Sequence, residues 1–135
     1  MRANLTFANL RGANLEDTNL YDARLAAADL TKANLRRADL RKADLTEANL
    51  NGADLTEARV GGAELFRSDL RLAVLRLADF GAANFREAQI AGADFHGASL
   101  KTSILRETNL DGADLSGADL STTLLPRGYK LPGRG

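Results

Sequence analysis

The sequence contains no cysteine or tryptophan, only one histidine and two prolines, and few aromatic residues, 5% of its 135 positions. Without cysteine, the chain has no disulfide bonds and no thiolate chemistry. No apolar run approaches the roughly 20 residues that a membrane-spanning helix requires, so no membrane partner is expected. Lysine plus arginine equals aspartate plus glutamate at 18 each, and this balance gives no long-range attraction to nucleic acid.

Residues with catalytic chemistry are equally scarce. His96 is the only histidine, and we expect it to be a solvated surface residue. The sequence has no nucleophilic serine turn, no phosphate-binding loop and no metal-ligand spacing. We therefore predict a protein that is not an enzyme and uses no cofactor and no metal. Because Met1 leads directly into the repeats, without a charged and then apolar leader, the expected location is cytoplasmic.

What the sequence does have is a period of five residues. An apolar residue, called position i here, stands at each of the 25 multiples of five from Leu5 to Leu125. Position i−2 is Ala, Ser or Thr in all 25 repeats, and position i−1 is Asp or Asn in 17 of them. A repeat of this regularity decides the architecture before any other feature.

A period of five fits neither a long helix nor a long strand, because the apolar residues would not stay on one face. Within one repeat, however, i−2 and i can both point inward from a short extended segment, and i+1 and i+2 can turn a corner. The chain then coils, and successive coils pair about 4.8 Å apart. Four of the seven glycines at i+2 fall in one column if a coil has four sides: Gly12, Gly52, Gly92 and Gly112.

Repeats such as Ala-Asn-Leu-Arg-Arg at 33–37 and Ala-Asp-Leu-Thr-Glu at 43–47 resemble the pentapeptide repeat family. The resemblance covers residues 3–127. It implies an all-β fold, a right-handed quadrilateral (four-sided) parallel β-helix solenoid. We expect this β-helix over residues 1–127, followed by a C-terminal tail over 128–135.

Charged residues must be considered in columns, since residues twenty apart stack in successive coils. The basic run at 32–42 then becomes a girdle of ion pairs rather than a nucleic-acid patch. The Asp and Asn residues at i−1 suggest either calcium binding or, as we favour, a hydrogen-bonded ladder on the outer face. The expected ion pairs join Arg36 and Arg37 to Glu16 and Asp17, Arg37 to Glu57, Lys42 to Asp22, and Arg67 to Glu47 and Glu87.

Departures from the repeat indicate where function could lie. Val74, Ile104 and Leu124 are apolar at the outward position i−1. An apolar centre with an arginine rim is typical of a contact surface, although scattered surface leucines are also common. The candidate interaction patch is Phe66, Arg67, Arg71, Leu72, Val74, Arg76 and Leu77. A candidate dimer edge beside the C-terminal end is Ile104, Leu124, Leu125, Tyr129 and Leu131.

These observations favour a rigid, non-enzymatic scaffold that binds a protein partner of unknown identity. The resemblance suggests an alternative, a DNA-mimicking protein that binds a topoisomerase, DNA gyrase, and gives inhibitor resistance. Zero net charge and the lack of loop insertions count against that alternative. We also expect a homodimer, because an uncapped solenoid exposes core and unpaired backbone at its ends.

Overall fold

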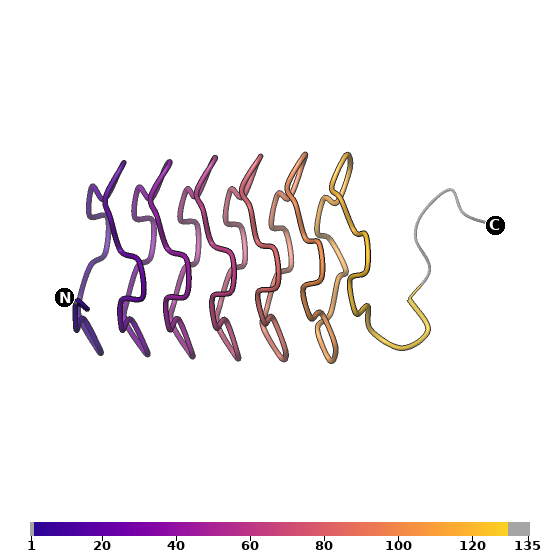
Figure 1. Cartoon of the computed structure of the whole chain (residues 1–135), viewed down its shortest axis with the longest axis horizontal. Helices are drawn as coiled ribbons and strands as arrows, with labels where there is room; N and C mark the ends of the chain where they lie inside the picture. Colours follow the sequence, from indigo (N-terminus) through magenta and orange to yellow (C-terminus); the bar gives the residue numbers. More distant parts are fainter. Residues whose placement is uncertain (1, 130–135) are drawn as a thin grey trace.

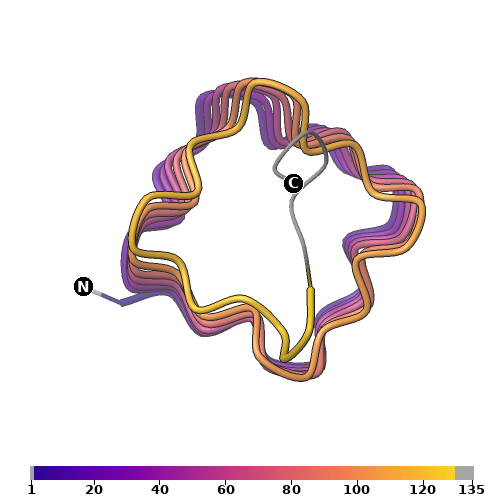
Figure 2. The same ribbon diagram turned by 90° about the vertical axis from the view of Figure 1, so that its right-hand side faces the viewer.

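The computed structural model describes residues 2–129, and these form a stack of similar coils along one axis (Figure 1). Seen down that axis, the coils superpose in a four-sided outline (Figure 2). Parallel bridges join each i−1 residue from Asn4 to Ile104 to the i−1 residue twenty positions later. The predicted four-sided coil of twenty residues is therefore confirmed.

Within residues 2–129 there is no helix and no continuous strand, only these isolated bridges. Each side consists of three extended residues between two turns. Only the middle residue forms bridges, to the coil before it and to the coil after it. The all-β prediction holds for the pairing, but the sides are too short to count as regular strands. No helix among these residues is long and apolar enough to cross a membrane.

The turns have the same geometry in the repeats from Leu5 to Leu120. The N–H group at i+3 donates to the carbonyl at i, as from Ala38 to Leu35 at 3.0 Å. Residue i+2 has a positive φ in every repeat from Phe7 to Thr122, and glycine is not required there: Asp17 has φ 60° and Lys32 has φ 57°. Every corner therefore adopts the conformation that favours glycine, and the four-sided coil that the glycine spacing indicated is correct.

The Asp and Asn residues at i−1 hold these turns. In every repeat that has one, its side-chain Oδ1 accepts a hydrogen bond from the backbone N–H at i+1, as from Thr46 to Asp44 at 3.0 Å. This is the local pattern by which Asx side chains favour turns. The predicted ladder between coils is mostly absent, and two cross-coil contacts of this kind are Asn34 to Asn14 at 3.4 Å and Asn84 to Glu64 at 2.6 Å.

Three backbone hydrogen bonds per repeat join neighbouring coils, and this ladder is interrupted on one side only. Between residues 87–92 and 106–111, four expected bonds are not formed. Thr108, on that side, instead donates through its hydroxyl to the Phe85 carbonyl at 2.7 Å. The missing bonds would run from the N–H groups of Glu87, Ile90, Gly92 and Asn109 to the carbonyls of Arg106, Asn109, Asp111 and Ala88.

The core is a stack of inward leucines and alanines, fully buried through the middle coils. Phe80, Phe85 and Phe95 fill one coil with ring centroids 5.1–6.0 Å apart, in tilted or edge-on contacts that favour aromatic pairs. The core becomes half-exposed at both ends: at Leu5, Leu10 and Leu15, and at Leu115, Leu120 and Leu125.

The repeat register ends near Pro126. The last bridge joins Ile104 to Leu124, and the next turn is displaced by one residue, with Gly128 taking the positive φ and Tyr129 donating to the Pro126 carbonyl at 3.1 Å. Leu124 lacks the Asx side chain of other repeats. In this repeat position i+1 is Pro126, which has no backbone N–H group. An Asx side chain at position 124 would therefore have no donor to accept from.

Candidate interaction surfaces

Two leucines dominate the candidate interaction patch. Leu72 and Leu77 are at i+2 on neighbouring corners and are 65% and 59% exposed. Val74 lies half-buried on the side between them. Each leucine lies over a glycine of the next coil, Leu72 over Gly92 and Leu77 over Gly97. In the patch, the two exposed leucine side chains therefore pack against glycine backbone of the next coil.

The remaining patch residues are Phe66 and three arginines. Phe66 is half-buried on the preceding corner, under the Arg67 guanidinium, which is 5.1 Å from the ring centroid. Arg71 turns back to Asp69 of its own coil at 2.8 Å, and Arg76 pairs with Asp94 of the next coil. The apolar centre is thus Leu72, Val74 and Leu77 alone, and its arginine rim is largely neutralised by these carboxylates.

The carboxylates beside the patch are held ionised. The side-chain hydrogen bond from Arg71 keeps the pKa of Asp69 below its ordinary value, despite the opposing effect of burial. Burial raises the pKa of Asp94, but the His96 backbone N–H and the Arg76 guanidinium outweigh it and lower that pKa overall. The rim of the patch therefore carries fixed charges of both signs at neutral pH.

Beyond the leucines, the two corners continue as glycine. A Cβ atom on Gly112 would lie 3.5 Å from the Gly92 nitrogen, and one on Gly117 would lie 3.6 Å from the Gly97 nitrogen. His96 lies on this surface, exposed, with its Nδ1 2.9 Å from Ser116 Oγ. The leucines therefore lie at the edge of a surface lined by glycine backbone, which a partner can approach closely because these glycines carry no side chains.

The candidate dimer edge divides into two surfaces. Leu125 and Tyr129 pack against the core at the open C-terminal end, whereas Ile104 and Leu124 face outward on one side of the solenoid, with Leu124 46% exposed. Our grouping of Leu125 with these two residues was therefore wrong, because position i points inward. Leu131 lies outside the described residues.

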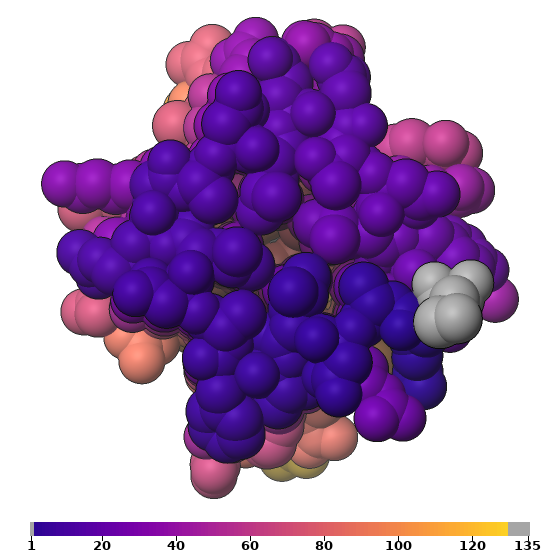
Figure 3. Space-filling model, turned by 90° about the vertical axis from the view of Figure 1, so that its left-hand side faces the viewer, coloured from indigo at the N-terminus to yellow at the C-terminus, as the bar shows by residue number. Residues whose placement is uncertain are grey.

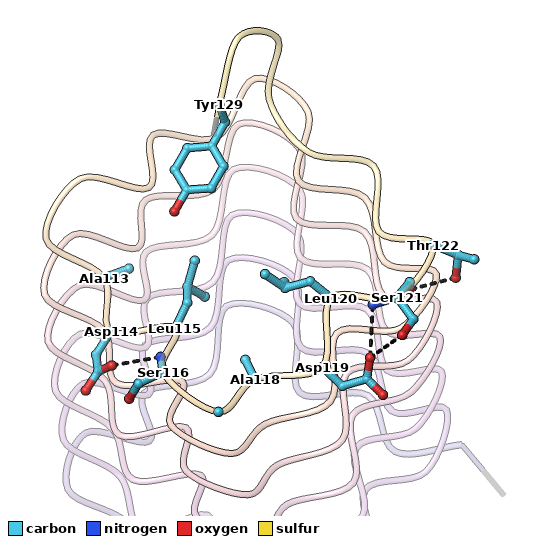
Figure 4. A pocket seen from close by; sticks show the side chains of 11 residues that line it. Ala113, Asp114, Leu115, Ser116, Ala118, Asp119, Leu120, Ser121, Thr122 and Tyr129 are labelled. Carbon is cyan, nitrogen blue, oxygen red and sulfur yellow. Dashed lines mark hydrogen bonds between the residues drawn. The ribbon is translucent and has the colours of Figure 1, made fainter. Parts of the chain in front are cut away.

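The C-terminal end forms an open recess of about 820 Å³. Tyr129 projects across it, above the inward residues Leu115 and Leu120 (Figure 4). At the opposite end, the first coil surrounds a central hollow (Figure 3). Phe7 near that end is 80% exposed. Sequence reasoning missed it, although an apolar residue at i+2, the signal that identified Leu72 and Leu77, is present there too.

A second recess of about 810 Å³ lies on the side that carries Ile104 and Leu124. Sequence reasoning found its apolar residues but missed its arginines, because the rule by which arginines pair in this solenoid becomes visible only in the structure. The residues that line this recess, called the arginine groove here, are Arg86, Ile104, Arg106, Glu107, Leu124, Pro126 and Arg127.

The predicted ion pairs are confirmed in part. Arg37 contacts Asp17 and Glu16, both at 2.9 Å, and Arg67 contacts Glu87 at 3.5 Å. Other pairs were wrong, because side chains also reach partners in their own coil or at offsets other than twenty. Among residues 2–129, no ion pair joins Arg37 to Glu57, Lys42 to Asp22 or Arg67 to Glu47, and Asp22 pairs instead with Arg2 at 3.3 Å.

No group of three or more His, Asp and Glu side chains in the described part of the chain could hold a metal ion. The Asp and Asn oxygens at i−1 are already hydrogen-bonded to their own turns, as Asp54 Oδ1 is to the Thr56 N–H at 2.9 Å. Their geometry therefore serves the backbone and does not converge on one point, as calcium ligands must.

The profile of the pentapeptide repeats family matches the chain in eight copies, over residues 1–37, 23–62, 33–71, 63–101 and 83–121. No curated protein matches. Among solved structures, a pentapeptide repeat protein from the thylakoid lumen of Arabidopsis thaliana is 33% identical with a TM-score of 0.55, covering 72% of this chain. This chain spans 64% of the length of that protein.

Two further solved structures are similar to the chain. HetL, a pentapeptide repeat protein involved in heterocyst differentiation regulation in the cyanobacterium Nostoc sp. strain PCC 7120, is 32% identical, with coverage of 96% and 75% and a TM-score of 0.43. QnrB1, a plasmid-mediated fluoroquinolone resistance protein, is 20% identical, with coverage of 89% and 76% and a TM-score of 0.43.

Proposed function

Because the chain belongs to the pentapeptide repeat family, we propose that it is a non-enzymatic scaffold that binds a protein partner through the Leu72–Leu77 surface. The observation that carries this proposal is the pair of leucines, 65% and 59% exposed, on adjacent corners of the solenoid. Burying them against a partner would be favourable at about 25 cal/mol per Å² of apolar area. Because their backing is fixed, little ordering would be needed on binding.

The experiment that tests this proposal is site-specific photo-crosslinking in cells of the source organism. A photoreactive residue at Leu72 should give an adduct of defined mass, and the same residue at Lys42, another exposed i+2 corner, should not. Adding Leu77→Asp to the Leu72 probe should remove the adduct. An equal yield of the same adduct from both positions, or no adduct at Leu72, would contradict the proposal.

We propose further that the solenoid winds in a right-handed sense and that the protein is cytoplasmic. We also propose that it forms a homodimer in which the two copies contact each other through their open C-terminal ends. Leu115, Leu120 and Leu125 are half-exposed there, and such an end exposes core and unpaired backbone. Light scattering should detect a dimer for the wild type and for Leu72→Asp with Val74→Asp. Leu125→Asp with Tyr129→Ala should be a monomer, and a monomeric wild type would refute the dimer.

The gyrase-binding alternative has weaker support. Bridges at a constant spacing of twenty run from Asn4 to Leu124 without an inserted loop, and the net charge is zero, whereas a mimic of DNA needs an acidic surface. A gyrase supercoiling assay with a quinolone inhibitor separates the two functions. A scaffold should leave inhibition unchanged, and dose-dependent relief of inhibition would favour the alternative.

A further inference from the structure

Arg106 is the one half-buried arginine among residues 2–129 without a carboxylate partner. The other two, Arg36 and Arg41, pair with Asp54 at 3.1 Å and Asp39 at 2.7 Å. The Arg106 Nε is shielded from solvent and has no hydrogen-bond acceptor. Leaving a buried charged donor without an acceptor is costly, so this guanidinium is suited to an acceptor from outside the chain.

The repeat explains why Arg106 has no partner. An arginine at i+1 bonds the i−1 aspartate of its own coil, as Arg71 bonds Asp69, or that of the next coil, as Arg36 bonds Asp54. For Arg106 these two positions are Ile104 and Leu124. Both of the carboxylates that the repeat would supply are replaced by apolar side chains.

The unpaired Arg106 lies beside apolar side chains. Arg106 lines the arginine groove together with Ile104 and Leu124. Arg86 in the same groove is occupied by Glu107 at 2.9 Å. Arg106 and Arg127 are left without an ion pair in the described part of the chain. The groove therefore offers positive charge directly beside an apolar wall.

The backbone at the same corner is also incompletely paired. The Glu87 N–H does not donate to the Arg106 carbonyl, although the matching bond forms two coils earlier, from Glu47 to Phe66 at 2.8 Å. Unpaired backbone groups are rare in folded proteins and are satisfied by water or by a ligand. Among the i+2 residues from Phe7 to Thr102, only Glu87 and Gly92, on two adjacent corners, have N–H groups that lack this bond to the next coil.

We propose that the arginine groove binds a segment of a partner protein that carries a carboxylate side chain next to an apolar side chain. Arg106 donates to the carboxylate, and Ile104 and Leu124 contact the apolar side chain. A guanidinium fork matches a carboxylate geometrically. The apolar wall disfavours a strongly hydrated phosphate, and Glu107 disfavours a polyanion such as nucleic acid.

The test is selection from a phage library of short random peptides against the immobilised wild-type protein, followed by affinity measurements on the selected peptides. Enriched peptides should carry Asp or Glu beside an apolar residue. Arg106→Gln should weaken their binding at least about tenfold, the effect of losing a charge-assisted hydrogen bond. Leu124→Asp should do the same, because a carboxylate there would pair with Arg106 as Asp54 pairs with Arg36.

Arg11→Gln, which alters an i+1 arginine outside both the groove and the candidate interaction patch, is the matched control and should leave affinity unchanged. Equal melting curves establish that the variants are folded. Enriched peptides without an acidic residue, unchanged binding to Arg106→Gln, or no enrichment at all would each overturn the proposal. A wild-type dimer that dissociates on Arg106→Gln would also overturn it, because the occupant would then be a second copy of this chain.

Discussion

Leu72 lies so close over Gly92 of the next coil that a Cβ atom built on Gly92 would stand 2.8 Å from Leu72 Cδ2. The same relation holds between Leu77 and Gly97, also at 2.8 Å. In both cases the glycine leaves room for the leucine, and the leucine covers the glycine backbone. The two glycines thus determine where the exposed leucines lie.

Gly92→Ala is expected to lower the free energy of unfolding by about 1–2 kcal/mol. The φ of 72° costs an L-residue about 1 kcal/mol, and the new methyl group must displace Leu72. Gly62→Ala is the control, because Gly62 has a similar φ of 68° but its nearest neighbour, Lys42 Cγ, is 3.7 Å away. Urea unfolding measures both, and equal losses would contradict the described contact.

Asp44 supports a test of the turn hydrogen bonds, since its Oδ1 accepts from the Thr46 N–H at 3.0 Å and the residue has no ion pair among residues 2–129. Asp44→Ala should cost about 1 kcal/mol of stability, the usual net value of one hydrogen bond. Asp44→Asn keeps the accepting oxygen and should cost much less. Chemical denaturation compares them, and similar losses for both variants would mean that the charge, not the bond, matters.

Acid should destabilise the solenoid. The pKa of Asp39 is lowered chiefly by the side-chain hydrogen bond from Arg41, and that of Asp69 by the bond from Arg71. Because the folded pKa lies below the unfolded value of 3.8, their contribution to stability is present above that pH. It is lost as the pH falls through the folded pKa. The aspartates at i−1 with a lowered pKa are Asp29, Asp39, Asp54, Asp69, Asp94, Asp114 and Asp119.

Urea unfolding at several pH values between about 6 and about 3 measures this effect. Asp39→Asn with Asp69→Asn keeps both turn acceptors but removes both titrating groups, so the double variant should lose less stability on acidification than the wild type. An equal pH dependence in the two proteins would refute the assignment to these residues.

The interrupted ladder should be visible in amide hydrogen exchange. The N–H groups of Ile90 and Asn109 have no backbone acceptor, whereas that of Asp114 donates to the Ala93 carbonyl at 2.9 Å. The first two should exchange faster than the third, because exchange follows local opening. Heteronuclear NMR resolves the three, and equal protection would mean that the coils pair there as elsewhere.

The sequence by itself determined the coil. An unbroken period of five, with apolar i and small i−2, can be buried only if the chain turns after every repeat, so the inward position of Leu55 or Phe85 followed without a structure. The Asp and Asn preference at i−1 was equally visible. The reason for this preference could not be predicted from the sequence. Whether an Asp or Asn side chain holds its own turn or reaches the next coil depends on the backbone conformation.

Only the tertiary structure decided how side chains combine on the surface. Arg36 and Arg106 occupy the same position in their repeats, yet one pairs with an aspartate of the next coil and the other faces Ile104 and Leu124. Likewise, Leu72 acquires its fixed place from Gly92, twenty residues away. These relations depend on which side chains of neighbouring coils actually touch, and column membership alone did not predict that.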